Sequence, residues 1–265
     1  MTDEHSGERI ASRDHPVSPD GPRKPALIIF DVNETLSDMS PMARRFEDVG
    51  APAHLASSWF AGLLRDGFAL TVVSASDSFA RLAQDSLRIS LHGQKLDRDA
   101  DAAVQHIMGG FTALLVHPDV PDGVRALTAL GIRLVTLSNG SAAIAEGLLD
   151  RASIRGHFEE LLSVEDAGAW KPAGRAYAHA LVRRDVDPMD AMLVAVHPWD
   201  IDGAARAGLG TAWINRNGEP YPGYFRSPDI MATSLTDLAD QLHRWTRPTS
   251  GGGDGSDQFS DAIRL

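Results

Sequence analysis

Short apolar runs alternate with segments of helical spacing along most of this chain, and this alternation restricts the possible folds more than any other feature. The apolar runs fall at residues 26–31, 133–138, 161–164, 192–196, 211–214 and 230–233. Segments with helical spacing follow at residues 121–130, 142–149, 173–183, 202–207 and 235–242. Strands that alternate with helices form a parallel sheet with right-handed crossovers and helices on both faces. We therefore predict an α/β fold with a Rossmann-like sheet.

A long stretch without a comparable strand separates the first apolar run from the second. Residues 37–118 are too many for a loop, and apolar residues such as Leu55 and Leu63 recur there at helical spacing. We predict that this stretch is an inserted helical domain. Residues 26–36 and 119–245 then form the α/β core domain.

Both ends of the chain have compositions that disfavour regular structure. Residues 1–25 are polar and interrupted by prolines, and residues 246–265 include a run rich in glycine and serine. Such segments bury too little apolar surface to offset the entropy lost on ordering. We predict a disordered N-terminal tail and a flexible C-terminal tail at these positions.

The charge of the chain limits the class of partner. The 265 residues carry a formal net charge of −11 at pH 7, whereas nucleic acid or an anionic membrane would require a basic surface. A small-molecule ligand is expected instead. No apolar run approaches the roughly 20 residues that span a bilayer, and the N-terminus lacks the pattern of a signal peptide, so we expect a cytoplasmic protein. The absence of cysteine excludes disulfides, a thiol nucleophile and Cys-ligated metal.

Polar side chains follow several predicted strands at the point where each strand ends. They are Asp31, Asn33, Thr35, Ser138, Asn139, Lys171, His197 and Asp200. The carboxyl ends of parallel strands meet at one edge of a sheet, so we expect these side chains to converge there. Each has an ordinary structural interpretation as well, such as a turn cap for Asp31, a solvated amine for Lys171 or a helix cap for Asp200. Their coincidence on one edge favours a catalytic site.

Seven of these positions belong to four short motifs that occur in a fixed order. The motifs are Phe30-Asp31-Val32-Asn33-Glu34-Thr35-Leu36, Leu137-Ser138-Asn139-Gly140, Lys171-Pro172 and Trp199-Asp200. In this order they resemble the motifs of the haloacid dehalogenase superfamily, and most closely its L-2-haloacid dehalogenase (type II) branch. The resemblance extends over residues 26–242. It implies a helical cap domain inserted directly after the first strand, which corresponds to residues 37–118.

The resemblance implies that Asp31 is a covalent nucleophile. Asp31 would displace halide from C2 of a small, anionic 2-haloacid, and water would then hydrolyse the aspartyl ester to give a 2-hydroxy acid. An ammonium at Lys171 would favour the ionised form of Asp31, and Asp200 would hold Lys171 in place. Further contacts to the nucleophile or the substrate are expected from Thr35, Asn33, Ser138, Asn139 and Tyr177, the last of which matches a tyrosine of the family.

Most members of the superfamily are Mg²⁺-dependent phosphatases, and these carry acids at two positions where this chain has Asn33 and Val196. A hard divalent cation needs several oxygen ligands, and an asparagine cannot act as the general acid on a leaving group. We therefore predict a metal-independent enzyme with no cofactor. A Mg²⁺-dependent phosphatase, with Asp202 compensating for the missing acid, is the alternative.

The chain departs from the type II enzymes in its expected halide site. Those enzymes have an arginine directly after a tryptophan on the first cap helix, whereas here Trp59 is followed by Phe60. We expect Trp59 and Phe60 to line the substrate pocket. Arg65 is expected to replace the missing arginine, with Arg44 and Arg45 as alternatives.

The second departure is His197, which stands where the family has an asparagine. An imidazole at this position suits a base that activates the hydrolytic water. These departures leave open a catalytically silent member that binds a ligand in its cap pocket. A homodimer is also possible, because dimers are common in the type II branch.

Overall fold

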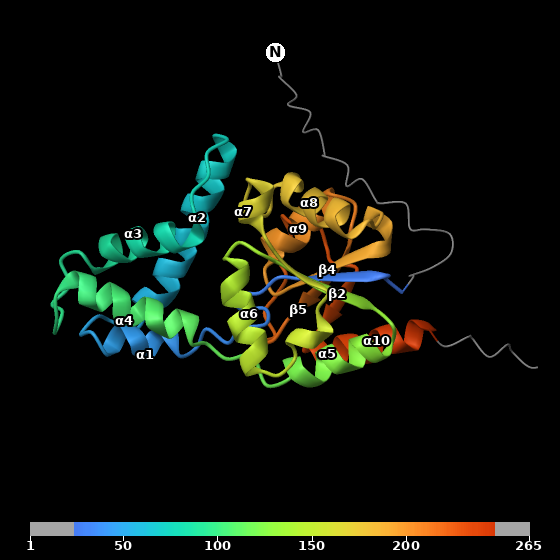
Figure 1. Cartoon of the computed structure of the whole chain (residues 1–265), viewed down its shortest axis with the longest axis horizontal. Helices are drawn as coiled ribbons and strands as arrows, with labels where there is room; N and C mark the ends of the chain where they lie inside the picture. Colours follow the sequence, from blue (N-terminus) through green and yellow to red (C-terminus); the bar gives the residue numbers. More distant parts are fainter. Residues whose placement is uncertain (1–23, 247–265) are drawn as a thin grey trace, which may run out of the picture.

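The computed structural model describes residues 24–246. Almost all of the predicted N-terminal tail, residues 1–25, and of the predicted C-terminal tail, residues 246–265, lies outside the described residues. The described part contains a parallel sheet with helices on both faces and four helices that lie together beside it (Figure 1). The predicted α/β fold class is confirmed. The predicted domain boundaries remain predictions.

Six parallel strands form the sheet, in the order β3-β2-β1-β4-β5-β6. They are β1 (Leu27–Phe30), β2 (Arg133–Ser138), β3 (Glu160–Ser163), β4 (Ala191–Ala195), β5 (Gly210–Ile214) and β6 (Ile230–Ala232). The chain builds outward from β1 on one side, crosses back to β4 and then builds outward on the other side. Ligands of such sheets bind where this direction reverses, beyond the carboxyl ends of the strands. In this protein that point lies between β1 and β4.

The register of the central strands determines which residues lie side by side where the strands end. Phe30, the last residue of β1, pairs with Thr136 of β2 and with Val194 of β4. Asp31 therefore comes directly after the sheet at the level of the last residues of both neighbours, and its backbone N–H still donates to the carbonyl of Val194 at 3.1 Å. The position of Asp31 is thus set by the sheet.

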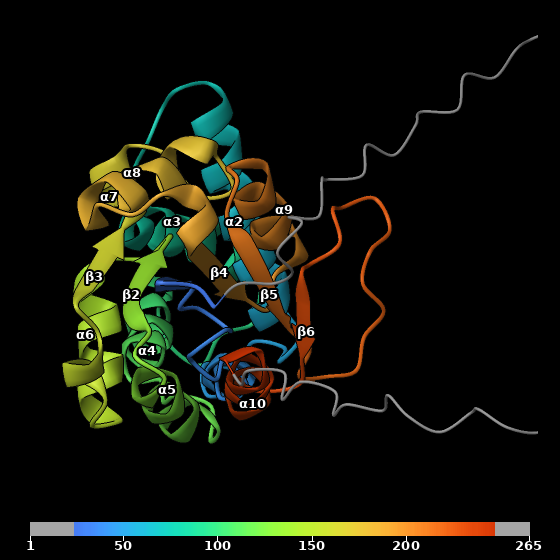
Figure 2. The same cartoon turned by 90° about the vertical axis from the view of Figure 1, so that its right-hand side faces the viewer.

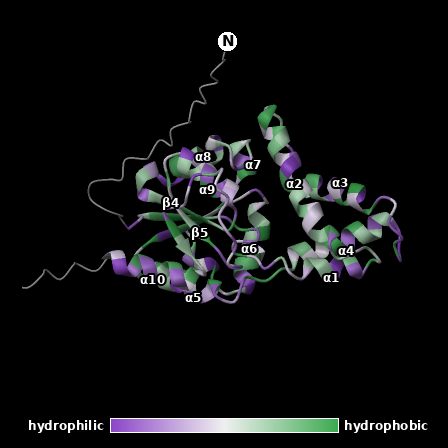
Figure 3. Cartoon of the chain, turned by 180° about the vertical axis from the view of Figure 1, so that it is seen from behind, coloured by the Kyte–Doolittle hydropathy of each residue, from purple (hydrophilic) through white to green (hydrophobic). Residues whose placement is uncertain are grey.

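Five helices cover the two faces of the sheet (Figure 2). They are α5 (Val120–Ala129), α6 (Ala142–Arg151), α8 (Gly174–Arg184), α9 (Pro198–Arg206) and α10 (Leu235–Thr246). Ile28 and Phe30 of β1 pack in one apolar cluster with α5, α6 and α10, whereas Leu27 and Ile29 pack in another with α8 and α9. Each fully buried aliphatic side chain stabilises the fold by about 1.5–3 kcal/mol. The strand β4 is hydrophobic along its length in Figure 3, as a sheet covered on both faces requires.

The four remaining long helices lie within the predicted insertion. They are α1 (Met42–Glu47), α2 (Leu55–Val72), α3 (Phe79–Leu91) and α4 (Ala100–Thr112). Side-chain caps fix the starts of two of them, because Ser78 accepts from the N–H of Arg81 and Asp99 accepts from the N–H of Ala102. The chain leaves and rejoins the core side by side, through an antiparallel bridge between residues 37 and 116. Among residues 24–246 no helix is long and apolar enough to cross a membrane.

The helices α1 to α4 form a helical layer, and this layer packs against the core domain at Trp170. A Cβ built on Gly67 of α2 would lie 2.3 Å from the Trp170 ring, so only glycine allows this approach. The hydroxyl of Thr71 accepts from the backbone N–H of Trp170 at 3.0 Å, and Phe79 of α3 stacks on its ring with centroids 5.9 Å apart. A central contact of the layer is therefore made with the residue that directly precedes Lys171.

Two local predictions were wrong. Val164 was expected to end a strand but begins the short helix α7 (Val164–Ala167), because the Ser163 hydroxyl accepts from the N–H of Glu165 and turns the chain. The helix expected from residue 202 begins at Pro198, whose fixed φ suits a first helical position. Two short 3₁₀ helices, at Arg155–His157 and Pro188–Asp190, complete the described elements.

Candidate active site

Asp31 lies at the centre of a buried group of polar side chains. Its Oδ1 accepts from Nζ of Lys171 at 2.9 Å, and its Oδ2 accepts from the hydroxyl of Thr35 at 2.6 Å and contacts Nδ1 of His197 at 3.1 Å. The residue is 4% exposed. Burial alone would raise the pKa of Asp31, but Lys171, and then His197 and Thr35, hold it well below its usual range. Asp31 is therefore an ionised carboxylate.

The turn after Asp31 aims the hydroxyl of Thr35 at the carboxylate. The backbone N–H groups of Leu36 and Ser37 both donate to the carbonyl of Val32, which folds the chain back over the end of β1. The Thr35 hydroxyl accepts from the N–H of Val196 at 3.1 Å. Because its lone pair is engaged in that bond, its own proton is free to donate to Asp31.

Lys171 is fully buried between two carboxylates. Its Nζ lies 2.9 Å from Oδ1 of Asp31 and 2.6 Å from Oδ2 of Asp200. Burial alone would lower the pKa of Lys171, but the charges of Asp200 and Asp31 raise it above the usual value, so the group is an ammonium. The backbone N–H of Lys171 donates to Oδ1 of Asn139 at 2.9 Å. Asn139 therefore holds the chain that carries the ammonium.

Asp200 and Tyr177 form the most deeply buried part of this group of polar side chains. The Tyr177 hydroxyl donates to Oδ1 of Asp200 at 2.5 Å, and both residues are fully buried. Burial, together with the charge of Asp200, raises the pKa of Tyr177 well above its usual value. Burial also raises the pKa of Asp200, against the opposing charge of Lys171. Tyr177 was predicted to lean over the site toward a substrate, whereas its hydroxyl is directed at Asp200.

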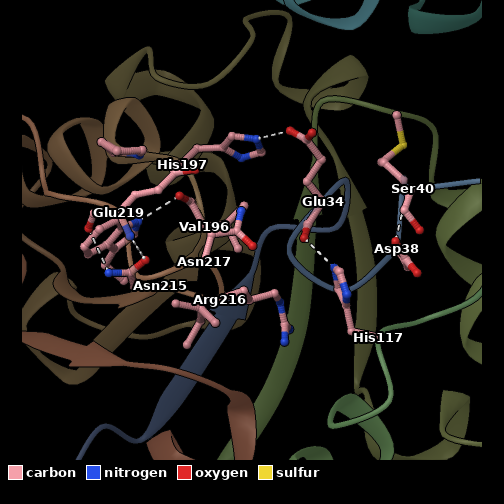
Figure 4. A pocket seen from close by; sticks show the side chains of 14 residues that line it. Glu34, Asp38, Ser40, His117, Val196, His197, Asn215, Arg216, Asn217 and Glu219 are labelled. Carbon is pink, nitrogen blue, oxygen red and sulfur yellow. Dashed lines mark hydrogen bonds and ion pairs between the residues drawn. The ribbon is translucent and has the colours of Figure 1, made fainter. Parts of the chain in front are cut away.

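His197 links Asp31 to a residue that the sequence interpretation passed over. Its Nδ1 faces Asp31, and its Nε2 lies 2.7 Å from Oε2 of Glu34 (Figure 4). Burial alone would lower the pKa of His197, but the bonds to Asp31 and Glu34 raise it to about 9. The ring is therefore an imidazolium near neutral pH, and both nitrogens donate. An imidazolium cannot accept a proton from water, whereas the predicted role as a base concerns the ester, in which Asp31 carries no charge, and it stays a prediction.

Protonation of His197 is expected to stabilise the fold in a defined pH range. The pKa is about 9 in the folded chain, against about 6.5 for an unperturbed histidine. The stabilisation is then complete below the unfolded pKa and is lost as the pH rises through the folded pKa. In urea titrations, the free-energy advantage of the wild type over His197→Gln should shrink by about 3 kcal/mol between about pH 6 and about pH 10. An advantage of equal size at both pH values would contradict this expectation.

The other predicted core residues lie next to the group. The Ser138 hydroxyl accepts from the N–H of Gly140 at 2.9 Å, which leaves its own proton available. Asn33 is buried, and its amide nitrogen would lie 3.6 Å from a Cβ built on Gly140. Both residues flank the start of α6. The structure therefore brings Ser138 and Asn33 to the edge of the sheet where Asp31 lies.

The residues predicted on the helical layer divide into two kinds. The indole N–H of Trp59 donates to the carbonyl of Ala83 at 3.1 Å, inside the layer, and Arg65 is 76% exposed and paired with Asp66. The structure does not bring either to Asp31. Phe60 lines a cavity of about 420 Å³ together with Glu34. A role for Arg65 in holding halide therefore remains a prediction without a supporting contact.

Two cavities lie beside the site, and Glu34 lines both of them. One, of about 420 Å³, lies under α1 and α2, and the other, of about 480 Å³, extends from His197 to the loop after β5 (Figure 4). The second cavity contains Arg216, whose guanidinium donates to the carbonyl of Thr35 at 3.0 Å and pairs with Asp119 at 2.6 Å. Glu34 and Arg216 are the functional candidates that the sequence interpretation missed. Glu34 lies inside a recognised motif, whereas no local signal points to Arg216.

A divalent metal would need a set of oxygen ligands at this edge. Within residues 24–246 no group of three or more His, Asp or Glu side chains is arranged to hold a metal ion. The space between the carboxylates of Asp31 and Asp200 is filled by the ammonium of Lys171. The donor set present does not fit a Mg²⁺ site.

Comparisons with known proteins agree with this geometry. The model of one family, the haloacid dehalogenase-like hydrolases, matches residues 25–208. The (S)-2-haloacid dehalogenase of Pseudomonas sp. (strain YL) is 29% identical over 78% of this chain and 90% of its own length. Haloacetate dehalogenase H-2 of Moraxella sp. (strain B) is 28% identical over 78% of this chain and 93% of its own length. A crystal structure of an L-2-haloacid dehalogenase superposes with a TM-score of 0.77 at 25% identity, covering 83% of this chain and all of that one.

Proposed function

This chain belongs to the haloacid dehalogenase-like hydrolases, and from that membership we propose that it hydrolyses the carbon–halogen bond of small 2-haloacids, with Asp31 as covalent nucleophile. The similar proteins named (S)-2-haloacid dehalogenase and haloacetate dehalogenase support this substrate class. The observation that carries the proposal is the buried, ionised carboxylate of Asp31, held by Lys171 and Thr35 at the switch point of the sheet. Such a group is a nucleophile whose position is fixed before substrate binds.

The first step is a displacement at carbon. One oxygen of Asp31 forms a bond to C2 of the substrate while the bond from C2 to the halogen breaks, and the halide leaves with the bonding electron pair. The charge of Asp31 is consumed in this step, so the buried ammonium of Lys171 keeps only Asp200 as an anionic partner. Attack from the side opposite to the halogen inverts the configuration at C2.

The second step is hydrolysis of the ester. The oxygen of a water molecule bonds to Cγ of Asp31, and the bond from Cγ to the ester oxygen then breaks, so that the 2-hydroxy acid leaves with that oxygen. One proton of the water goes to the hydroxyl of the product, and the other is released to solvent. The carboxylate of Asp31 is regenerated with one oxygen from water.

The start of α6 suits the carboxylate of the substrate. Its N-cap residue, Ser141, makes no side-chain cap bond, and the helix follows directly after Ser138, Asn139 and Gly140. Backbone N–H groups at a helix start, together with the positive end of the helix dipole, bind anions. A substrate carboxylate placed there would put C2 near Asp31, because β1 and β2 are neighbours in the sheet.

A screen for halide release decides between the candidate functions. We expect release of chloride from 2-chloropropionate, in the presence of EDTA, that is unchanged when Mg²⁺ is added. In ¹⁸O-water, mass spectrometry should find ¹⁸O in the peptide that contains Asp31, because water attacks Cγ. Hydrolysis of p-nitrophenyl phosphate that requires Mg²⁺, without halide release, would favour the phosphatase alternative. Absence of halide release and of ¹⁸O with every 2-haloacid tried would favour a ligand-binding protein.

A further inference from the structure

Glu34 is a partly exposed residue that lines both cavities, and its backbone is fixed by two contacts and a rare conformation. Its backbone has a φ of 64°, in the left-handed region that non-glycine residues rarely adopt. Its N–H donates to the hydroxyl of Ser37 at 3.2 Å, and its carbonyl contacts Nε2 of His117 at 3.0 Å. The carboxylate is thereby directed at His197, and the strained backbone is a reason to look for function.

The hydrogen bonds to the carboxylate of Asp31 are distributed unequally. Oδ1 has one donor, the ammonium of Lys171, whereas Oδ2 has two, the hydroxyl of Thr35 and the imidazolium of His197. The more strongly solvated oxygen is the poorer nucleophile and the better place for negative charge. The geometry therefore distinguishes the two oxygens before any substrate binds.

On the basis of the proposed function, we propose that Glu34 is a positioning residue that keeps His197 as a hydrogen-bond donor to Oδ2 of Asp31. Oδ1 then forms the ester bond to C2. When the water oxygen bonds to Cγ, the electron pair of the carbonyl bond moves to Oδ2, and Thr35 and His197 hold the resulting oxyanion. The electron pair on Oδ2 then re-forms the carbonyl bond to Cγ while the bond from Cγ to Oδ1 breaks, and Oδ1 leaves with that bonding pair and takes a proton from the water as the hydroxyl of the product.

The need for Glu34 arises from the ester intermediate itself. In the free protein both Asp31 and Glu34 favour the imidazolium form of His197. Formation of the ester removes the charge of Asp31, and within the described residues Glu34 is then the remaining carboxylate bonded to the ring. Donors fixed in advance at a developing oxyanion accelerate acyl transfer by about 10²–10³-fold each. Glu34 thus acts in the step in which Asp31 no longer can.

The other charged groups near His197 affect the protonation of its ring less directly than Glu34 does. Lys171 reaches the ring only through Asp31, and the ring stacks on Trp199 with centroids 4.9 Å apart. The cavity beside His197 also contains Asp38, His117, Arg216 and Glu219. Arg216 is neutralised by Asp119. In the described part of the chain, the side chain of Glu219 lines the same cavity but forms no hydrogen bond or ion pair with the ring, and it therefore provides a matched control.

Two measurements test this role, and the first requires no activity. The ring nitrogens of His197 are titrated by ¹⁵N NMR in the wild type, Glu34→Gln and Glu219→Gln. We expect the pKa of His197 to fall by about one unit or more in Glu34→Gln, because one of its two anionic partners is lost. In Glu219→Gln it should stay within about a few tenths of a unit. An unchanged pKa in Glu34→Gln overturns the proposal, whether or not the protein is a dehalogenase.

The second measurement separates the two chemical steps by rapid quench with a 2-haloacid. Ester formation, followed as a burst of halide, should change less than about threefold in Glu34→Gln. Hydrolysis of the ester should be near the wild-type rate at about pH 6 and about fivefold or more slower than in the wild type at about pH 9, because the imidazolium is then lost. Equal slowing of both steps at all pH values would assign Glu34 a purely structural role and overturn the proposal. Absence of halide release in the wild type would instead refute the proposed function, and the NMR titration would still decide the role of Glu34.

Discussion

Replacement of Asp31 by Asn should lower the rate of halide release by about 10⁴-fold or more, since the amide removes the nucleophile while keeping its shape. The amide oxygen of Asn can still accept from Lys171, which lies 2.9 Å from Oδ1, and the amide nitrogen can donate to the hydroxyl of Thr35, which lies 2.6 Å from Oδ2, so the fold should be retained. The measurement is halide release under saturating 2-haloacid. Intact-mass analysis before the assay verifies that the amide has not hydrolysed back to Asp31.

The matched control for this substitution is Asp38→Asn. Asp38 follows the same strand, and its Oδ1 caps the backbone N–H of Ser40 at 2.9 Å, a role that an amide oxygen can also fill. This variant should release halide within about twofold of the wild type, since Asp38 lies outside the bonded group around Asp31. Activity of Asp31→Asn above about one hundredth of the wild type, with the amide intact, would rule out the covalent role.

Replacement of Lys171 by Met should destabilise the fold more than any other single change at the site. The ammonium lies between two buried carboxylates, and its loss leaves Asp31 and Asp200 facing each other without a cation. Removal of one partner from a buried ion pair costs about 3–5 kcal/mol. We expect a reduction of this size in the free energy of unfolding in urea at neutral pH. The penalty should be smaller at about pH 5, because uptake of one proton relieves the repulsion.

Lys95→Met provides the comparison, because Lys95 is exposed and lies on the helical layer. That variant should unfold within about 0.5 kcal/mol of the wild type. A Lys171→Met protein of nearly wild-type stability at neutral pH would mean that one carboxylate is already protonated in the native state. In that case Asp31 and Asp200 would not both be ionised in the native protein.

Most of the fold could be predicted, because its signals are local. A strand buried on both faces is a run of apolar residues, and the helices that cover it carry apolar residues at helical spacing, as in Ile28 and Phe30 against α5 and α10. The two errors concern ends of elements. At Ser163 a single side-chain bond to the N–H of Glu165 converts the end of a strand into a helix start. Such a bond depends on the path of the chain and leaves no pattern in the composition.

The central residues of the site could also be predicted, because a parallel sheet brings strand ends to one edge. Asp31 and Asp200 follow neighbouring strands, and Lys171 lies in a loop at the same edge. Side-chain direction could not be predicted in the same way. Tyr177 turns inward to Asp200, and Arg216 crosses from the loop after β5 to the carbonyl of Thr35. Both contacts join residues far apart in sequence.

The protonation state of His197 depends on Glu34, a residue of the first motif to which the sequence alone assigned no role. With an ordinary pKa, an imidazole beside a reacting ester suits a base, and this was the interpretation from the sequence alone. The carboxylate of Glu34, 2.7 Å from Nε2, changes the ring into a donor. That contact requires the left-handed backbone of Glu34, and a sequence pattern does not reveal the sign of φ.

The contact of the helical layer with Trp170 links the packing of that layer with the electrostatics of the site. Gly67 and Phe79 contact the ring of Trp170, and Lys171 is the next residue along the chain. Any opening of the layer that lifts Trp170 therefore pulls on the peptide that carries the ammonium, while Asn139 holds it from the other side. A substitution that shifts this contact is therefore expected to weaken the bond between Lys171 and Asp31. The packing of the helical layer and the charge of the nucleophile are thus coupled through two consecutive residues, Trp170 and Lys171.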